Sequence, residues 1–198
     1  MQGPIPIESR ALGTLAFIRT SIEASGSMAV PGMAGITMGA IGILAAILAS
    51  LPATALHWLE IWLIAAPIAL AAGAAMMARA AAQSGHARYL GPVRKFLLCL
   101  CPALFAGAVL TGVLWRRGAT PLIPGVWLLL YGCAVLSAST VTLPRTMRLI
   151  GCMGTLFMVL GLLAFMAPAR LHTLILGMGF GALHSVFGIV IGRVNHGG

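Results

Sequence analysis

The chain has 198 residues, of which 60% are hydrophobic and only 8% are charged. A soluble domain carries about a quarter charged residues, because its surface must be polar in water. Acidic side chains are limited to Glu8, Glu23 and Glu60, and the chain contains no Asp. This composition excludes a water-soluble globule, a disordered chain and a site built from several carboxylates. It predicts an integral membrane protein.

The net charge of +9 does not indicate a nucleic-acid-binding protein. The 12 Lys and Arg residues lie between apolar runs, and no basic stretch is interleaved with aromatic side chains. Basic residues in such positions contact lipid headgroups and set the orientation of a membrane protein. We therefore expect the lipid bilayer, and not nucleic acid, as the partner of these charges.

Residues 1–29 form a predicted amphipathic segment that precedes the membrane domain. Its apolar residues recur at helical spacings of three and four, at Leu12, Leu15, Ile18 and Ile22. This pattern is typical of a helix that lies along a membrane surface, here the cytoplasmic one. A signal peptide is the weaker alternative, because its apolar core from 11 to 18 would be only 8 residues long before Arg19.

Six apolar stretches are long enough to cross a bilayer, which takes about 20 residues of helix. They lie at about 30–51, 57–78, 96–115, 123–142, 149–167 and 171–192. Gly and Pro residues between them mark the turns. The predicted fold is therefore all-α, with a six-helix transmembrane domain over 30–198.

The basic residues are distributed unequally between the two sides of this predicted bundle. One side has nine of them, namely Arg10, Arg19, Arg79, Arg88, Arg94, Lys95, Arg145, Arg148 and Arg193. The other side has three, namely Arg116, Arg117 and Arg170. The positive-inside rule then predicts that both termini are cytoplasmic.

Small residues predict where the helices pack closely, since membrane helices associate through close backbone approach. The first span contains Gly35, Gly39 and Gly42; the fifth contains Gly151, Gly154 and Gly161; the sixth contains Gly177, Gly181, Gly188 and Gly192. We expect these three spans to supply the central contacts. The four tryptophans, Trp58, Trp62, Trp115 and Trp127, all fall near the predicted outer boundary, where amphipathic rings prefer to lie.

A cluster of polar side chains is predicted at the outer surface. His57 and Glu60 share a helix face, His172 opens the sixth span at a similar depth, and Arg116 and Arg117 end the third span on that side. Two functional interpretations are binding of a cation such as Zn²⁺ and proton exchange by Glu60 during transport. The structural alternative is an interfacial ion pair that positions the helix ends.

His184 is the deepest predicted histidine, about 20 Å below the outer end of its helix. Its expected hydrogen-bond partners are Ser137, Ser139 or Thr140 on the fourth span. The sequence leaves two interpretations open: a structural bond between helices, or a role toward a ligand, a quinone or a proton relay. Haem is not expected, because His184 has no second histidine at matching depth.

No enzyme is expected, and no cofactor or metal. Phosphate loops, nucleophile elbows and HExxH motifs are absent from the sequence. A chain with no Asp and one Glu in its spans also has little equipment for general acid–base catalysis. The four cysteines, Cys99, Cys101, Cys133 and Cys152, are interpreted as small hydrophobic residues within the spans.

Several segments, at 17–20, 30–32, 124–132 and 179–198, resemble a group of small six-helix bacterial inner-membrane proteins of unassigned activity. The resemblance implies a bacterial inner-membrane location and work with a soluble partner. The sequence accordingly favours a non-enzymatic sensor or scaffold that acts with a soluble cytoplasmic protein or as a homo-oligomer. The alternative is a small transporter for a cation or a proton-coupled solute that uses Glu60 and His184.

Overall fold

The computed structural model describes Leu15 and residues 29–51, 55–83 and 90–196, and these contain helices and no strand. Five spans are continuous α-helices: α2 (Gly32–Ala49), α3 (Ala55–Gln83), α4 (Leu90–Arg116), α5 (Ile123–Ser139) and α6 (Pro144–Met166). The last span is composite, with α7 (His172–Leu176), the π-helix η4 (Gly177–Leu183) and α8 (His184–His196).

Among the described residues, six helical segments are long and apolar enough to cross a membrane, as the sequence predicted. The third and fifth begin several residues earlier than expected, at Leu90 and Pro144. Apart from Leu15, the predicted amphipathic segment at 1–29 lies almost entirely outside the described residues, which there begin at Ala29.

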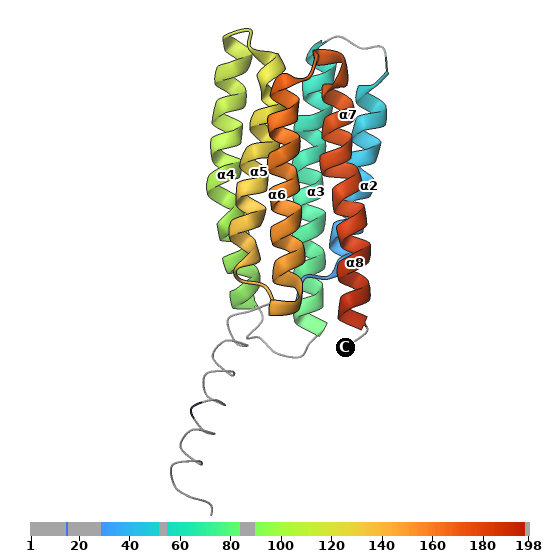
Figure 1. Cartoon of the computed structure of the whole chain (residues 1–198), viewed down its shortest axis with the longest axis vertical. Helices are drawn as coiled ribbons and strands as arrows, with labels where there is room; N and C mark the ends of the chain where they lie inside the picture. The colour runs from blue at the N-terminus through green and yellow to red at the C-terminus, as the bar shows by residue number, and fades with distance from the viewer. Residues whose placement is uncertain (1–14, 16–28, 52–54, 84–89, 197–198) are drawn as a thin grey trace, which may run out of the picture.

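The helices run up and down in an antiparallel bundle (Figure 1). We call the end with the α2–α3, α4–α5 and α6–α7 connections the upper end, and the end at which α8 finishes the lower end. Proline and glycine shape the connections: Pro144 occupies the first turn of α6, and Gly118, with φ of 70°, turns the chain after α4.

Basic side chains are concentrated at the lower end. There the described helices carry Arg79, Arg94, Lys95, Arg145, Arg148 and Arg193, all exposed. The upper end carries Arg116, Arg117 and Arg170. The N-terminal end of α2 and the C-terminal end of α8 both lie at the lower end (Figure 1), so the positive-inside rule again predicts a cytoplasmic lower face.

The first and sixth spans pack closely through their glycines. A Cβ atom added at Gly188 would lie 2.6 Å from the backbone nitrogen of Ile36 and 2.7 Å from the carbonyl oxygen of Gly32. At Gly42 it would lie 2.5 Å from the carbonyl oxygen of Phe180. No larger side chain fits at this contact unless the helices move apart. The glycines of the first and sixth spans thus take part in close helix contacts, as predicted, and the structure shows that these two spans contact each other.

The glycines of the fifth span serve a different partner from the one expected. Gly154 and Gly161 on α6 face Gly132 and Gly125 on α5, and α5 with α6 makes the most extensive helix contact among the described residues. Between this pair and the last span lies an apolar core that includes the fully buried Leu128, Phe157 and Leu176. The bundle is therefore organised around two tight pairs, α5–α6 and α2 with the last span.

Candidate ligand site inside the bundle

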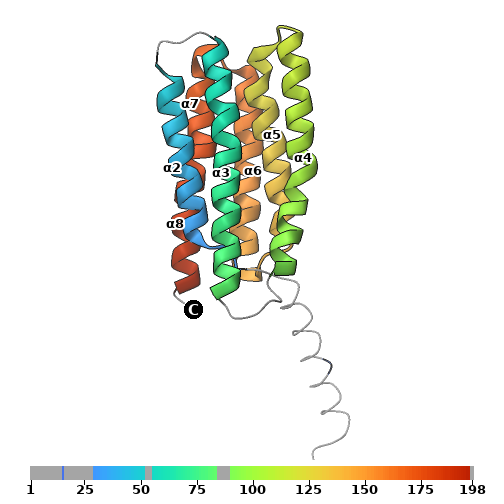
Figure 2. The same ribbon diagram turned by 180° about the vertical axis from the view of Figure 1, so that it is seen from behind.

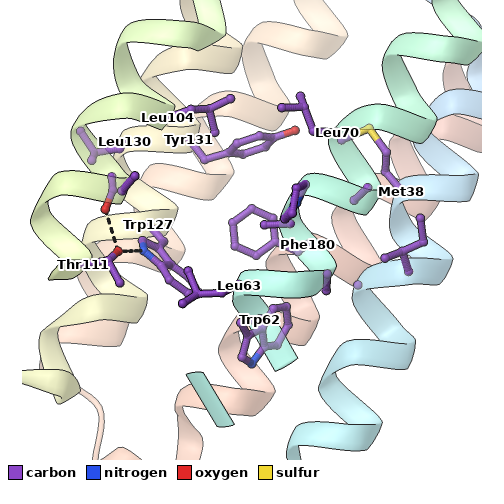
Figure 3. Close-up of a pocket in the computed structure, with 18 of the residues that line it drawn as sticks. Met38, Trp62, Leu63, Leu70, Leu104, Thr111, Trp127, Leu130, Tyr131 and Phe180 are labelled. Carbon is purple, nitrogen blue, oxygen red and sulfur yellow. Dashed lines mark hydrogen bonds between the residues drawn. The ribbon is translucent and has the colours of Figure 1, made fainter. Parts of the chain in front are cut away.

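A cavity with a volume of about 360 Å³ lies in the upper half of the bundle. Its walls come from α2, α3, α4, α5, η4 and the first residue of α8, and its side chains are almost all apolar (Figure 3). Leu63 and Leu70 of α3, Leu104 of α4 and Leu130 of α5 are among them. The volume falls in the range of about 300–1,000 Å³ that ligand sites usually have.

The cavity reaches the outer surface of the bundle between α3 and α4. Leu63, Ala66 and Pro67 of α3 and Ala108 of α4 line it and are exposed. These two helices follow each other in the chain, yet they contact each other far less than α3 contacts α2 or α4 contacts α5. Figure 2 shows α3 and α4 on one face of the bundle, with α5 and α6 visible between them. In a membrane this opening would face lipid.

Tyr131 and His184 form a polar pair at the inner wall of the cavity. The Tyr131 hydroxyl lies 2.7 Å from Nε2 of His184, and His184 is only 4% exposed. Aromatic rings enclose the pair: the Phe157 ring centroid lies 4.9 Å from that of Tyr131 and 5.3 Å from that of His184. Phe180 contacts both rings as well.

The π-helix η4 brings Phe180 and His184 to this wall. Single π-helical turns are rare and occur often at functional sites, because the extra residue per turn redirects side chains. Here η4 contains Gly177, Gly179 and Gly181, and its Phe180 carbonyl group lies against Gly42 of α2. The wider turn therefore approaches α2 closely while it directs an aromatic ring and an imidazole toward the cavity.

A second polar pair lies nearer the upper end. The Trp127 indole Nε1 donates a hydrogen bond of 2.7 Å to the Thr111 hydroxyl, which itself donates one of 2.6 Å to the Gly107 carbonyl oxygen (Figure 3). Trp58 stacks on Trp127 with the ring centroids 6.5 Å apart. Its Nε1 donates to the Thr173 hydroxyl at 2.9 Å. The tryptophans predicted at the boundary thus include rings that pack inside the bundle.

Two buried side-chain nitrogens in the described part of the chain lack a hydrogen-bond partner of ordinary geometry, Nε1 of Trp62 and Nδ1 of His184. Both residues line the cavity. Unpaired buried nitrogens are uncommon in native proteins, and they mark this wall as a place where polar groups are incompletely satisfied.

A second, smaller cavity of about 80 Å³ lies in the lower half of the bundle. Met38, Leu70, Tyr131 and His184 line both cavities. The Tyr131–His184 pair therefore stands between two internal spaces that follow one another along the bundle axis.

The predicted outer cluster does not form a metal site among the described residues, where no three His, Cys, Asp or Glu side chains come together. Glu60 is exposed on α3 and does not line the cavity. His57 is exposed near the upper end of α3. His172 is buried, and its Nε2 lies 3.2 Å from the Ala167 carbonyl oxygen. Arg116 and Arg117 are exposed.

The partners predicted for His184 were wrong. Ser139 and Thr140 instead donate to backbone carbonyl groups of their own chain segment, at Leu136 and Ser137, and Tyr131 takes their place. The sequence analysis also missed Trp127 and Thr111 as cavity residues. A signal was present, because Trp127 and Tyr131 lie four residues apart and so share one face of an α-helix.

No protein-family model, no curated protein and no solved structure matches the chain. The resemblance to six-helix bacterial inner-membrane proteins therefore stays a prediction. The features of the molecule that bear on its function are the cavity, its opening and its polar pairs.

Proposed function

We propose that this multi-pass membrane protein binds a lipophilic small molecule, which it takes up from the bilayer through the opening between α3 and α4. The observation that supports the proposal most directly is the cavity of about 360 Å³ that reaches the lipid-facing surface and ends at the buried Tyr131–His184 pair. Protein interiors are otherwise packed with few voids larger than a water molecule. A space of this size, with an opening and a polar end, is suited to a ligand.

The lining decides between a lipophilic and an ionic ligand. Within the part of the chain that the structure describes, no Asp, Glu, Lys or Arg side chain lines the cavity. An ion placed there would lose its hydration without a compensating charge, which is very unfavourable in an apolar surrounding. The structure therefore offers more support for a lipophilic ligand than for the cation site predicted around Glu60.

Binding of a lipophile fits the expectation of a non-enzymatic sensor. The cavity is lined by five α-helices and η4, so a ligand in it would lie among all of them. Near the lower face, α3 carries Arg79, and α4 carries Arg94 and Lys95. We propose that occupancy of the cavity changes how this face meets a soluble protein or a second copy of the chain.

The second cavity favours a related candidate function, that of a carrier. Tyr131 and His184 line both spaces. A ligand held by them in the upper cavity would therefore lie next to the lower cavity. In this alternative the ligand crosses the bundle when the pair separates. Net movement of a bound lipophile between the leaflets of proteoliposomes, lost when the pair is cross-linked, would support the carrier over the sensor.

A cavity-filling substitution with a matched control tests the binding function. Gly107 lines the cavity, and an added Cβ atom would meet only Leu130 Cδ1, at 3.7 Å. Gly112 lies on the same helix but is exposed and has nothing within 4 Å of an added Cβ atom. Gly107→Met should therefore fill the site, and Gly112→Met should extend into lipid.

The probe is 4-fluoro-1-methoxynaphthalene, followed by ¹⁹F NMR in detergent micelles, with empty micelles as the blank. We expect saturable binding to the wild type and to Gly112→Met, and binding at least about tenfold weaker to Gly107→Met, since a lost apolar contact of about 1.4 kcal/mol is a factor of ten. Absence of saturable binding to the wild type, or equal binding to all three proteins, would overturn the proposal.

A further inference from the structure

Aromatic side chains are concentrated around the upper cavity. Trp, Tyr and Phe make up 7% of the chain, yet they supply four of the 20 described residues that line this space, namely Trp62, Trp127, Tyr131 and Phe180. These four come from three elements, α3, α5 and η4. In Figure 3 Tyr131 lies above Phe180, Trp62 lies below it and Trp127 lies to its left. A molecule in the cavity would therefore have aromatic rings on several sides.

Contacts within the protein hold these rings in place. The Phe180 ring centroid lies 5.2 Å from that of Tyr131, with an angle of 65° between the ring planes, and 6.2 Å from that of Trp62. Trp127 is held by its hydrogen bond of 2.7 Å to Thr111. Tyr131, Phe180 and Trp127 are only partly buried, so they keep surface for a ligand. Because the rings are already ordered, binding of a ligand costs less entropy.

The tails of membrane lipids are the competitors for this cavity, since its opening between α3 and α4 would face the bilayer. Lipid tails are as apolar as leucine. Aliphatic wall residues such as Leu104 and Leu130 therefore give a ligand no advantage over the tail that it replaces. Aromatic rings differ, because their faces are partly negative and their edges partly positive, and two rings in contact gain free energy beyond the area that they bury. Only a ligand with a ring of its own obtains this gain.

We propose that the ligand carries a planar aromatic ring, which lies among Phe180, Tyr131 and Trp127 in the upper cavity. The ligand class is then an aromatic lipophile, and not a lipid acyl chain or a saturated ring system of the sterol type. This inference rests on the proposed function, since it names the ligand of the same cavity. The aromatic walls would let the protein select such a molecule from a large excess of lipid tails.

Two probes with one skeleton and the same substituents test the inference. 4-Fluoro-1-methoxynaphthalene is aromatic, and a single stereoisomer of 4-fluoro-1-methoxydecahydronaphthalene is its saturated counterpart. Both are titrated by ¹⁹F NMR in detergent micelles, and each affinity is corrected for partition into empty micelles. In the wild type we expect the aromatic probe to bind about two- to tenfold more tightly, the fold-change that corresponds to one ring contact of about 0.5–1.5 kcal/mol.

A pair of wall variants shows whether aromatic contacts cause this preference. Phe180→Leu replaces a ring by an aliphatic side chain and leaves no hydrogen-bonding group without a partner, because Phe has no polar side-chain atom. The ratio of the two affinities should then fall at least about twofold. Leu104→Ala is the matched control, since it removes aliphatic wall only. There both affinities should fall while their ratio stays that of the wild type.

The outcomes separate the two proposals. Equal affinity of both probes for the wild type, or tighter binding of the saturated probe, with both weakened in Gly107→Met, would leave the binding function standing and overturn the aromatic ligand. A preference for the aromatic probe that is unchanged in Phe180→Leu would also overturn it. Failure of both probes to bind the wild type would overturn the proposed function and this inference with it. The wild-type comparison does not depend on the folding of any variant.

Discussion

Tyr131 on α5 and His184 at the start of α8 satisfy each other across the bundle, with 2.7 Å between the hydroxyl oxygen and Nε2. The two residues are 53 positions apart in the chain. The bond therefore ties the α5–α6 pair to the last span at the level of the cavity. It also fixes the orientation of His184, the one histidine among the described residues that lines either cavity.

Removal of this bond should destabilise the protein. In Tyr131→Phe the ring packing is retained but Nε2 of His184 loses its partner, and hydrogen bonds between membrane helices contribute about 0.6–1.7 kcal/mol. We expect a loss of about 1 kcal/mol in the free energy of unfolding, measured by SDS titration in mixed micelles. Thr155→Val is the control, because its exposed hydroxyl bonds only to Gly151 of its own helix. Equal losses in both variants would contradict the prediction.

The contact between α2 and the last span should be intolerant of a single methyl group. In Gly188→Ala the new Cβ atom would meet backbone atoms of Ile36 and Gly32 at 2.6–2.7 Å, so the helices must separate. We expect a cost of about 1–3 kcal/mol in the same unfolding assay, as for other overpacked sites.

Gly112→Ala provides the comparison, since nothing lies within 4 Å of its added Cβ atom. There the higher helix propensity of Ala should leave stability unchanged or raise it by up to about 1 kcal/mol. If Gly188→Ala were as stable as Gly112→Ala, the close approach of α2 to α8 would be wrong.

The sequence was sufficient for the positions of the spans, but not for which helices pair with each other. Span positions follow from the length of apolar runs, which the thickness of the bilayer determines directly. The glycines of the first and sixth spans predicted that these helices make close contacts, because membrane helices associate through close backbone approach. Their contact with each other was not predicted. The glycines of α6 gave no indication of which neighbour they would face, since every helix offered small residues.

The cavity and the partner of His184 could not be predicted in the same way. The cavity is a space left between side chains from six elements, and no pattern within one helix encodes such a space. The depth of His184 was calculated for a regular α-helix, but η4 is π-helical and advances less per residue. The Tyr131 hydroxyl reaches Nε2 of His184 at 2.7 Å, and spacing along a single helix could not predict this contact between α5 and α8.

The orientation in the membrane can be tested by cysteine labelling. Ala119 lies in the upper turn after α4, and Thr140 lies in the lower turn after α5. Each would be changed to Cys after the four native cysteines are replaced. In intact spheroplasts we expect a membrane-impermeant maleimide to label Ala119→Cys and to reach Thr140→Cys only after lysis, because the basic lower face is predicted to be cytoplasmic. The reverse pattern would invert the topology.

Glu60 and Trp62 are close neighbours on α3 and allow the two ligand chemistries to be compared. Glu60 is exposed outside the cavity, while Trp62 is 3% exposed and lines it. Glu60→Gln should leave binding of 4-fluoro-1-methoxynaphthalene within about twofold of wild type, the scatter expected for surface changes of about 0.5 kcal/mol. Trp62→Leu should weaken it several-fold, because the indole supplies a large part of the apolar wall.

The same ¹⁹F titration measures both variants, and the unfolding assay shows whether each is intact. A cation or proton-coupled transporter that works through its carboxylate predicts the opposite order, with Glu60→Gln the more severe change. If Glu60→Gln abolished binding and Trp62→Leu did not, the cavity would not be the ligand site. The site would then lie on the surface of α3 near His57.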